Sequence, residues 1–132
     1  MLTYTFRLKP GQDVFLEIER FVRDHSIQAG CVLATVGSLA HVLIRLADRE
    51  SPSEFEGPFE IVSLTGTLST FGSHLHISVS DEDGRTLGGH LLDGCKIYTT
   101  AEIVLAAFED VTYRRELLSN DSGYEELVVH PR

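Results

Sequence analysis

Residues 72–93 read GSHLHISVSDEDGRTLGGHLLD, and this pattern predicts a β-hairpin with two different faces. Polar and apolar residues alternate from His74 to Val79 without a break. Because successive side chains of a strand point to opposite faces, one face is polar and the other is apolar. The polar face holds His74, His76 and Ser78, and the apolar face holds Leu75, Ile77 and Val79. We expect the apolar face to pack into a core and the polar face to be available for chemistry.

The turn of this hairpin determines which residues stand opposite one another. A three-residue loop, Glu82-Asp83-Gly84, would place Gly84 in the left-handed conformation that glycine favours. The facing pairs would then be Asp81 with Arg85, Ser78 with Gly88, and His76 with His90. A two-residue Asp83-Gly84 turn would instead put His76 opposite Leu91 and mix polar and apolar side chains on both faces, which a one-sided sheet disfavours. We therefore predict the three-residue loop.

Three histidines of the hairpin, His74, His76 and His90, are predicted to hold a divalent metal ion. The first two lie about 7 Å apart between Cα atoms if the segment is a strand, and the third would stand beside them on the neighbouring strand. Three imidazole ligands leave one coordination position open for water or substrate, which is typical of catalytic rather than structural metal sites. The alternative is that these are ordinary surface histidines on the solvated face of the hairpin.

Composition limits the classes of protein to which the chain can belong. A length of 132 residues and a hydrophobic content of 42% predict a single domain over residues 1–132. The 11 basic and 20 acidic residues give a net charge of −9, which argues against nucleic acid as a partner. We find neither a signal-peptide pattern nor an apolar run long enough to cross a membrane, and expect a cytoplasmic protein. The two cysteines, Cys31 and Cys95, are expected to be buried thiols.

The remaining chain predicts strands and one clear helix, hence an α+β domain with a mostly antiparallel β-sheet flanked by that helix. Asp13 is the expected N-cap of the helix, whose inward face would be Val14, Ile18, Phe21 and Val22. The expected strands cover 2–8, two strands or one bent strand within 29–47, then 59–69, the hairpin, a long strand from 97 to about 115, and an edge strand over 124–129. The stretch 97–108 is apolar on both faces, which is typical of a central strand or a subunit interface.

Glu60 is the candidate for a catalytic helper beside the metal. It shares a predicted strand face with Val62 and Leu64, and burial of an unpaired carboxylate is costly. One interpretation is a general acid or base, or a partner of the metal ligands. The other is a glutamate at the end of a strand, exposed to water.

Two runs, GPFEIVSLTG at 57–66 and the hairpin from His74 to Asp93, resemble the plants-and-prokaryotes-conserved domain, also called domain of unknown function 296. The resemblance covers the chain from about Tyr4 to Val129 and implies an antiparallel sheet flanked by a helix and assembly as a homotrimer. In plants this domain follows a DNA-binding AT-hook and helps nuclear proteins to associate. The sequence holds no Arg-Gly-Arg-Pro core of an AT-hook, and Pro58 stands where the plant proteins carry Arg.

A more remote similarity links His74-x-His76 and the run from Gly88 to Asp93 to the metal-binding segment of acetolactate decarboxylase, a zinc enzyme. That similarity implies zinc, or another divalent metal, on His74, His76 and His90. The first functional hypothesis is therefore a stand-alone trimeric metalloprotein that transforms or senses a small molecule. The second is a non-catalytic oligomeric interaction or regulatory module, and direct DNA binding is the third.

Overall fold

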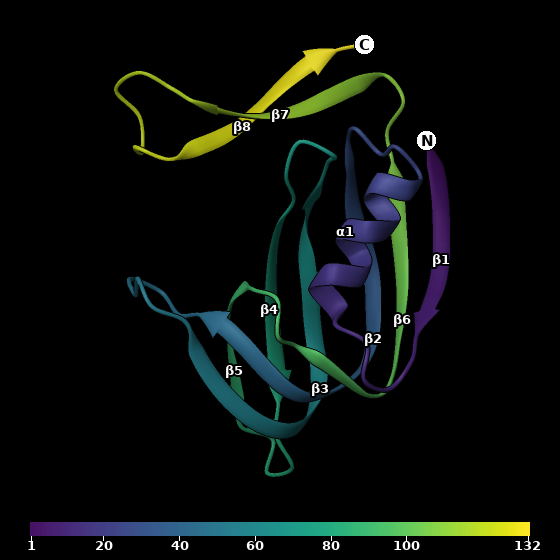
Figure 1. Cartoon of the computed structure of the whole chain (residues 1–132), viewed down its shortest axis with the longest axis vertical. Coiled ribbons are helices and arrows are strands. Elements are labelled where there is room, and N and C mark those ends of the chain that lie inside the picture. The colour runs from purple at the N-terminus through teal and green to yellow at the C-terminus, as the bar shows by residue number, and fades with distance from the viewer.

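The structure is a computed structural model that describes residues 1–132. It contains a curved antiparallel sheet with one helix on one of its faces, and a separate two-stranded hairpin at one end (Figure 1). The elements in chain order are β1 (Leu2–Leu8), α1 (Val14–Asp24), β2 (Gly30–Arg45), β3 (Ser53–Leu68), β4 (His74–Ser80), β5 (Thr86–Leu91), β6 (Lys96–Ala107), β7 (Val111–Leu117) and β8 (Glu125–Pro131). The expected α+β class, a single domain with a mostly antiparallel sheet and one helix, is confirmed.

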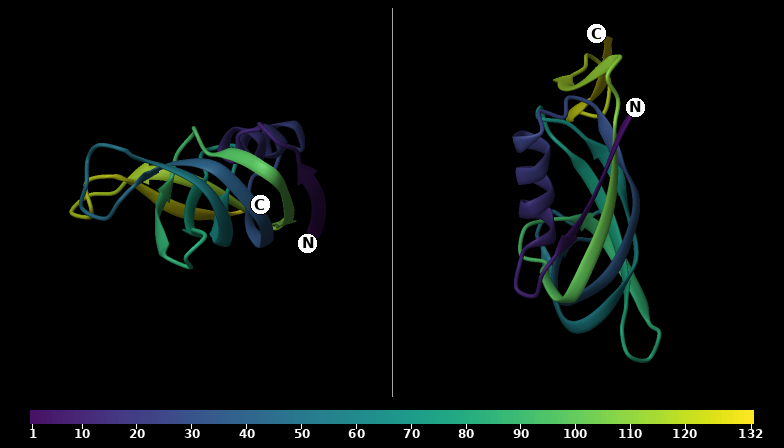
Figure 2. Two further views of the ribbon diagram at one scale, coloured as in Figure 1. Left: turned by 90° about the horizontal axis from the view of Figure 1, so that it is seen from below. Right: turned by 90° about the vertical axis from the view of Figure 1, so that its right-hand side faces the viewer.

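The six strands of the main sheet lie in the order β1-β6-β2-β3-β4-β5. The end of β2 also pairs with β5, through Ile44 with Leu91 and Arg45 with His90. This second pairing curls the sheet so that β2, β3, β4 and β5 close on one another (Figure 2). The edge strand β5 is thereby brought against the last residues of the central strand β2.

Helix α1 packs on the sheet as its sequence pattern predicts. Its N-cap Asp13 accepts a hydrogen bond from the backbone N–H of Leu16 at 3.0 Å, and its second carboxylate oxygen accepts one from the N–H of Gly94 at 2.6 Å. Val14, Ile18 and Val22 are buried, and Phe21 stacks on Phe6 with ring centroids 4.3 Å apart. The cap therefore fixes the helix both to its own first turn and to the loop before β6.

No helix of the structure has the length and the hydropathy that a bilayer crossing requires.

The hydrophobic core lies between α1 and the concave face of the sheet. The apolar face of β4 contributes Leu75, Ile77 and Val79, which are almost fully buried, as the alternation predicts. Cys95 is also buried, whereas Cys31 is only partly buried. Burial of the Cys95 thiol raises its pKa to about 11, so this cysteine is an unreactive core residue.

Two expectations about the strands are corrected by the structure. The continuous strand from 97 to about 115 is wrong, because β6 ends at Ala107 and β7 begins at Val111. After Ala107 the N–H of Phe108 donates to Ala29 and the N–H of Tyr113 donates to Gln28, so the chain follows the segment before β2 and leaves the sheet. The edge strand expected near the C-terminus is β8, which pairs with β7 alone in a separate two-stranded sheet.

The second correction concerns the start of the strand expected over 59–69. β3 begins at Ser53, six residues earlier than expected. Its first residues include the charged Glu54 and Glu56, which are exposed, and a strand can carry such residues on its solvated face. The segment 29–47 forms the single strand β2, whose register shifts near Gly37 correspond to the predicted bend. The stretch 97–107 is confirmed as a central strand between β1 and β2.

The packing of α1 can be tested by a pair of substitutions on the helix. Ile18→Ala is expected to lower the free energy of unfolding by about 2–5 kcal/mol, because Ile18 is fully buried and its removal leaves a cavity. Leu16→Ala, on the same helix at 49% exposure, should cost less than about 1 kcal/mol. Urea denaturation followed by circular dichroism measures both. Equal losses in the two variants would contradict this placement of the helix.

Candidate metal centre

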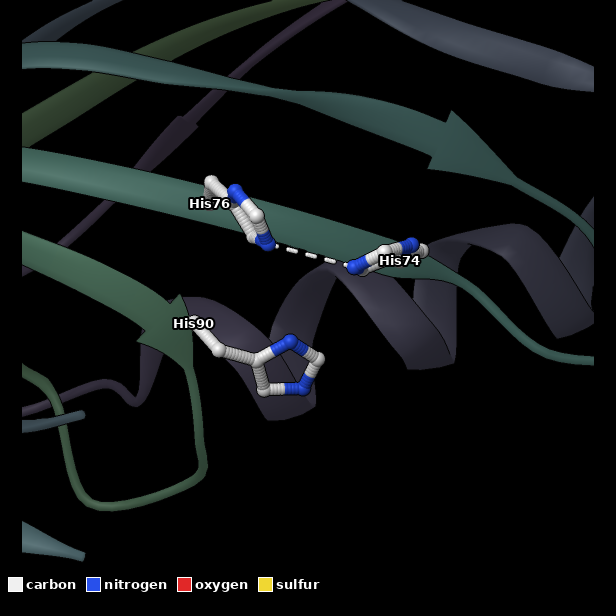
Figure 3. Close-up of side chains that lie close together, drawn as sticks. All are labelled: His74, His76 and His90. Carbon is white, nitrogen blue, oxygen red and sulfur yellow. Dashed lines mark hydrogen bonds between the residues drawn. The ribbon is translucent and has the colours of Figure 1, made fainter. Parts of the chain in front are cut away.

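The three histidines of the β4–β5 hairpin converge on one point of the polar face (Figure 3). One ring nitrogen from each of His74, His76 and His90 lies within 4.8 Å of the others. The Nε2 atoms of His74 and His76 are 3.1 Å apart. The ring centroid of His90 lies 5.3 Å from that of His74 and 5.7 Å from that of His76. The structure thus brings together the three residues that the sequence pattern selects.

The turn of the hairpin produces this convergence. Gly84 has a φ of +78°, and the N–H of Asp81 donates to the carbonyl of Arg85 at 2.9 Å, as in the predicted three-residue loop. The Asp81 carboxylate accepts hydrogen bonds from the N–H groups of Asp83 and Arg85, each at 2.9 Å. His76 consequently stands opposite His90 and Ser78 opposite Gly88, which confirms the predicted register.

Glycines bring β5 into close contact with both of its neighbours. A Cβ atom on Gly89 would lie 2.5 Å from the carbonyl oxygen of Arg45 in β2, and a Cβ atom on Gly88 would clash with the carbonyl oxygen of Ile77 in β4. Only a residue without a side chain allows these approaches. Since His90 follows directly, its position is fixed from both sides.

Electrostatics favour the neutral imidazoles that metals require. Partial burial, followed by the neighbouring His76, holds the pKa of His74 below its ordinary value of 6.5. Partial burial, followed by the nearby Arg45 guanidinium, likewise lowers the pKa of His90. At neutral pH both rings are therefore uncharged and offer a free lone pair.

The donor set fits a divalent metal such as zinc. Zinc–nitrogen bonds of about 2.0–2.1 Å at tetrahedral angles separate two ligand nitrogens by about 3.3 Å, close to the 3.1 Å between the Nε2 atoms of His74 and His76. Three imidazoles would leave at least one position for water or a ligand. A cavity of about 730 Å³ lies over the cluster and is bounded by the β2–β3 connection, Gly88, Gly89 and Tyr124. The site is therefore reachable from solvent.

Glu60 is not brought to the histidines within the chain. It pairs with Ser80, at the opposite end of β4 from His74, and its side chain is exposed. A register shift between Ile61 and Ser63 separates it from the buried Leu64, so the predicted shared face does not extend across the irregularity. Glu60 lines a small cavity of about 180 Å³ with Tyr98 and other residues.

Two residues beside the cluster, Arg45 and Arg115, were not selected by the sequence analysis. Arg45 is opposite His90 in the β2–β5 pairing. Arg115 of β7 donates a hydrogen bond to the Thr67 hydroxyl at 2.9 Å, and Thr67 is opposite His74. The sequence does mark Arg45 as unusual, because it is the only charged residue in the apolar stretch 29–47. No local pattern connects Arg115 with the hairpin.

Comparisons with known proteins agree with this fold. A solved hypothetical protein from Salmonella enterica aligns with a TM-score of 0.96 and 40% identity over 99% of this chain and 94% of its own. The Archaeoglobus fulgidus protein AF0104, described as metal-containing, aligns with a TM-score of 0.80 and 24% identity over 97% of this chain and 94% of its own. The latter likeness shows the fold alone.

Among curated proteins, the bifunctional protein GlmU of Synechococcus sp. (strain JA-3-3Ab) is 48% identical over 126 residues, which are 96% of this chain and 20% of that protein. The chain thus spans about a fifth of the length of this relative. The family described as the Plants and Prokaryotes Conserved (PCC) domain matches residues 1–109, which hold the six-stranded sheet, the helix and all three histidines of the hairpin. This chain belongs to that family.

Proposed function

We propose that the chain binds a divalent metal ion, zinc in the first place, through His74, His76 and His90, and offers it to a small molecule in the overlying cavity. The observation that carries the proposal is the convergence of three ring nitrogens within 4.8 Å, produced by the register of two strands. Support also comes from the description of the A. fulgidus relative as a metal-containing protein. Both transformation and sensing of the small molecule are consistent with such a site.

The residues of the chain prepare the site for such an ion. A bound zinc ion would supply Lewis-acid chemistry, polarising a carbonyl oxygen or lowering the pKa of a bound water. The β4–β5 ladder orients the imidazoles before any ion arrives, which reduces the conformational cost of binding. The lowered pKa values of His74 and His90 keep those two ligands unprotonated, so no proton must leave them at neutral pH.

The metal site is tested by zinc content and affinity. Purified protein that has been loaded with zinc and dialysed is expected to retain about one zinc ion per chain, as measured by mass spectrometry of the metal. The His74→Ala/His76→Ala double variant should retain none, since one imidazole cannot replace three. His130→Ala is the matched control, because His130 lies on the separate β7–β8 hairpin beside Glu116. Equal zinc contents in the wild type and the double variant would refute the site.

The pH dependence follows from the two lowered pKa values. In the metal-free protein, NMR titration of the imidazoles should give midpoints below 6.5 for His74 and His90. The unfolded chain then binds more protons than the folded one just below pH 6.5, so the free energy of unfolding should fall as the pH is lowered from 6.5 through the folded-state pKa values. Midpoints at or above 6.5 would contradict the environment described for the two rings.

We also propose a second property, self-association through the sheet face that α1 leaves uncovered. Val36, Val62 and Tyr98 are exposed there by 59%, 56% and 51%. Val36 and Val62 each lie two residues beyond the Ser38–Glu60 pair on neighbouring strands, so they are close together. Apolar side chains gathered on a sheet face indicate a protein contact. The family resemblance implies a homotrimer, and an oligomeric interaction module is the alternative function that this face supports.

Light scattering coupled to size-exclusion chromatography tests the assembly. The expected mass is three times the 14.7 kDa of one chain. Val36→Asp/Val62→Asp should shift the protein towards the monomer, because two carboxylates would be buried without partners. Leu16→Asp, on the outer side of α1, should leave the mass unchanged. A monomeric wild type would remove the basis of this second proposal.

A further inference from the structure

We propose that Arg45 and Arg115 form an anion-binding subsite beside the three histidines, and that the ligand of this centre is a small 2-oxo or 2-hydroxy carboxylate. The inference rests on the proposed metal function and names the class of ligand for the same site. A guanidinium group would bind the carboxylate, and the neighbouring oxygen would face the metal position. Both arginines line one cavity of about 350 Å³ together with His74 and His90.

Strand pairing places each arginine next to one of the histidines. Arg45 and His90 are direct partners across β2 and β5, so their side chains emerge on the same face of the sheet. The guanidinium of Arg115 reaches Thr67, the direct partner of His74, at 2.9 Å. The two cations therefore approach the histidine cluster from two different strands.

Neither arginine has an ion-pair partner, although the carboxylates of Glu125 and Glu126 line the same cavity. Five ion pairs are present in the structure, and neither Arg45 nor Arg115 takes part in one. The Arg115 stem packs near Gly72, and one of its nitrogens holds Thr67, which leaves its other donors available. In a chain with a net charge of −9, two unpaired cations in one cavity indicate a site for an anion.

The cavity selects a small, singly charged anion. Its volume of about 350 Å³ is at the lower end of small-molecule sites. Glu125 and Glu126 also line it and would repel each additional negative charge, so a carboxylate fits better than a phosphate dianion. A planar guanidinium matches a carboxylate with two parallel hydrogen bonds. An oxygen on the adjacent carbon would allow such a ligand to reach the neighbouring histidine cluster as well.

Binding of simple probes to the zinc-loaded wild type is the first test. Pyruvate is compared with pyruvamide, which has the same shape without the charge, and with inorganic phosphate, using ligand-observed NMR or calorimetry. Pyruvate is expected to bind at least about 10-fold more tightly than pyruvamide, as loss of a charge-assisted hydrogen bond implies. Equal affinities for pyruvate and pyruvamide, or tighter binding of phosphate, would overturn the inference.

Substitutions then locate the subsite. Arg45→Gln and Arg115→Gln should each weaken pyruvate binding about 10-fold or more while the zinc content stays at the wild-type value. Arg85→Gln, which removes the same charge at the turn of the hairpin, should change the affinity less than about 2-fold. Unchanged affinity in both cavity variants would overturn the subsite.

The two proposals fail in different ways in these measurements. A wild type that retains no zinc refutes the metal function and the inference that rests on it. A wild type that retains zinc but does not distinguish pyruvate from pyruvamide refutes only the anion subsite. If a variant does not fold, as judged by circular dichroism, the comparison of probes on the wild type still decides the question.

Discussion

The register between β4 and β5 is the constraint on which the histidine centre depends. Side chains alternate along a strand, so a slip of one residue would turn His90 into the core and expose Leu91, which is 1% exposed in the structure. Loss of the buried leucine alone would cost roughly 2 kcal/mol, and a buried imidazole without a partner would cost more. The forces that fold the hairpin are therefore the same forces that hold the three histidines in place.

Closure of the sheet brings a cationic side chain to the histidine cluster. Because the last residues of β2 reach β5, Arg45 comes to stand beside His90, although 45 positions separate them in the chain. The net charge of −9 would be expected to repel anions. At physiological ionic strength, however, charges are screened over about 8 Å. A ligand in the cavity therefore responds chiefly to the arginines and glutamates that line it, and less to the acidic residues elsewhere on the surface.

Local patterns predicted the parts of the structure that local forces determine. The alternation, the Gly84 turn and the Asp13 cap each depend on residues close in sequence, and all three are found as expected. The break after β6 was missed because backbone hydrogen bonds from Phe108 and Tyr113 to the distant segment 28–29 cause it. The predicted common face of Glu60 and Leu64 was wrong, because a register shift that no local signal marked lies between these two residues. Arg115 could not be found, since its approach depends on how the β7–β8 hairpin is attached.

The β7–β8 hairpin lies outside the part of the chain that matches the family. The family match ends at residue 109, so the histidines and Arg45 lie within the shared domain, and Arg115 lies beyond it. The hairpin is held by a few specific contacts: Arg115 with Thr67, the Ser69 hydroxyl with the carbonyl of Tyr113, and Arg114 over the ring of Phe71. The GlmU relative aligns over 126 of the 132 residues, so it must extend into this hairpin. The proposed metal ligands would then all come from the matched domain, whereas the proposed choice of ligand would depend in part on Arg115, in the hairpin outside the matched region.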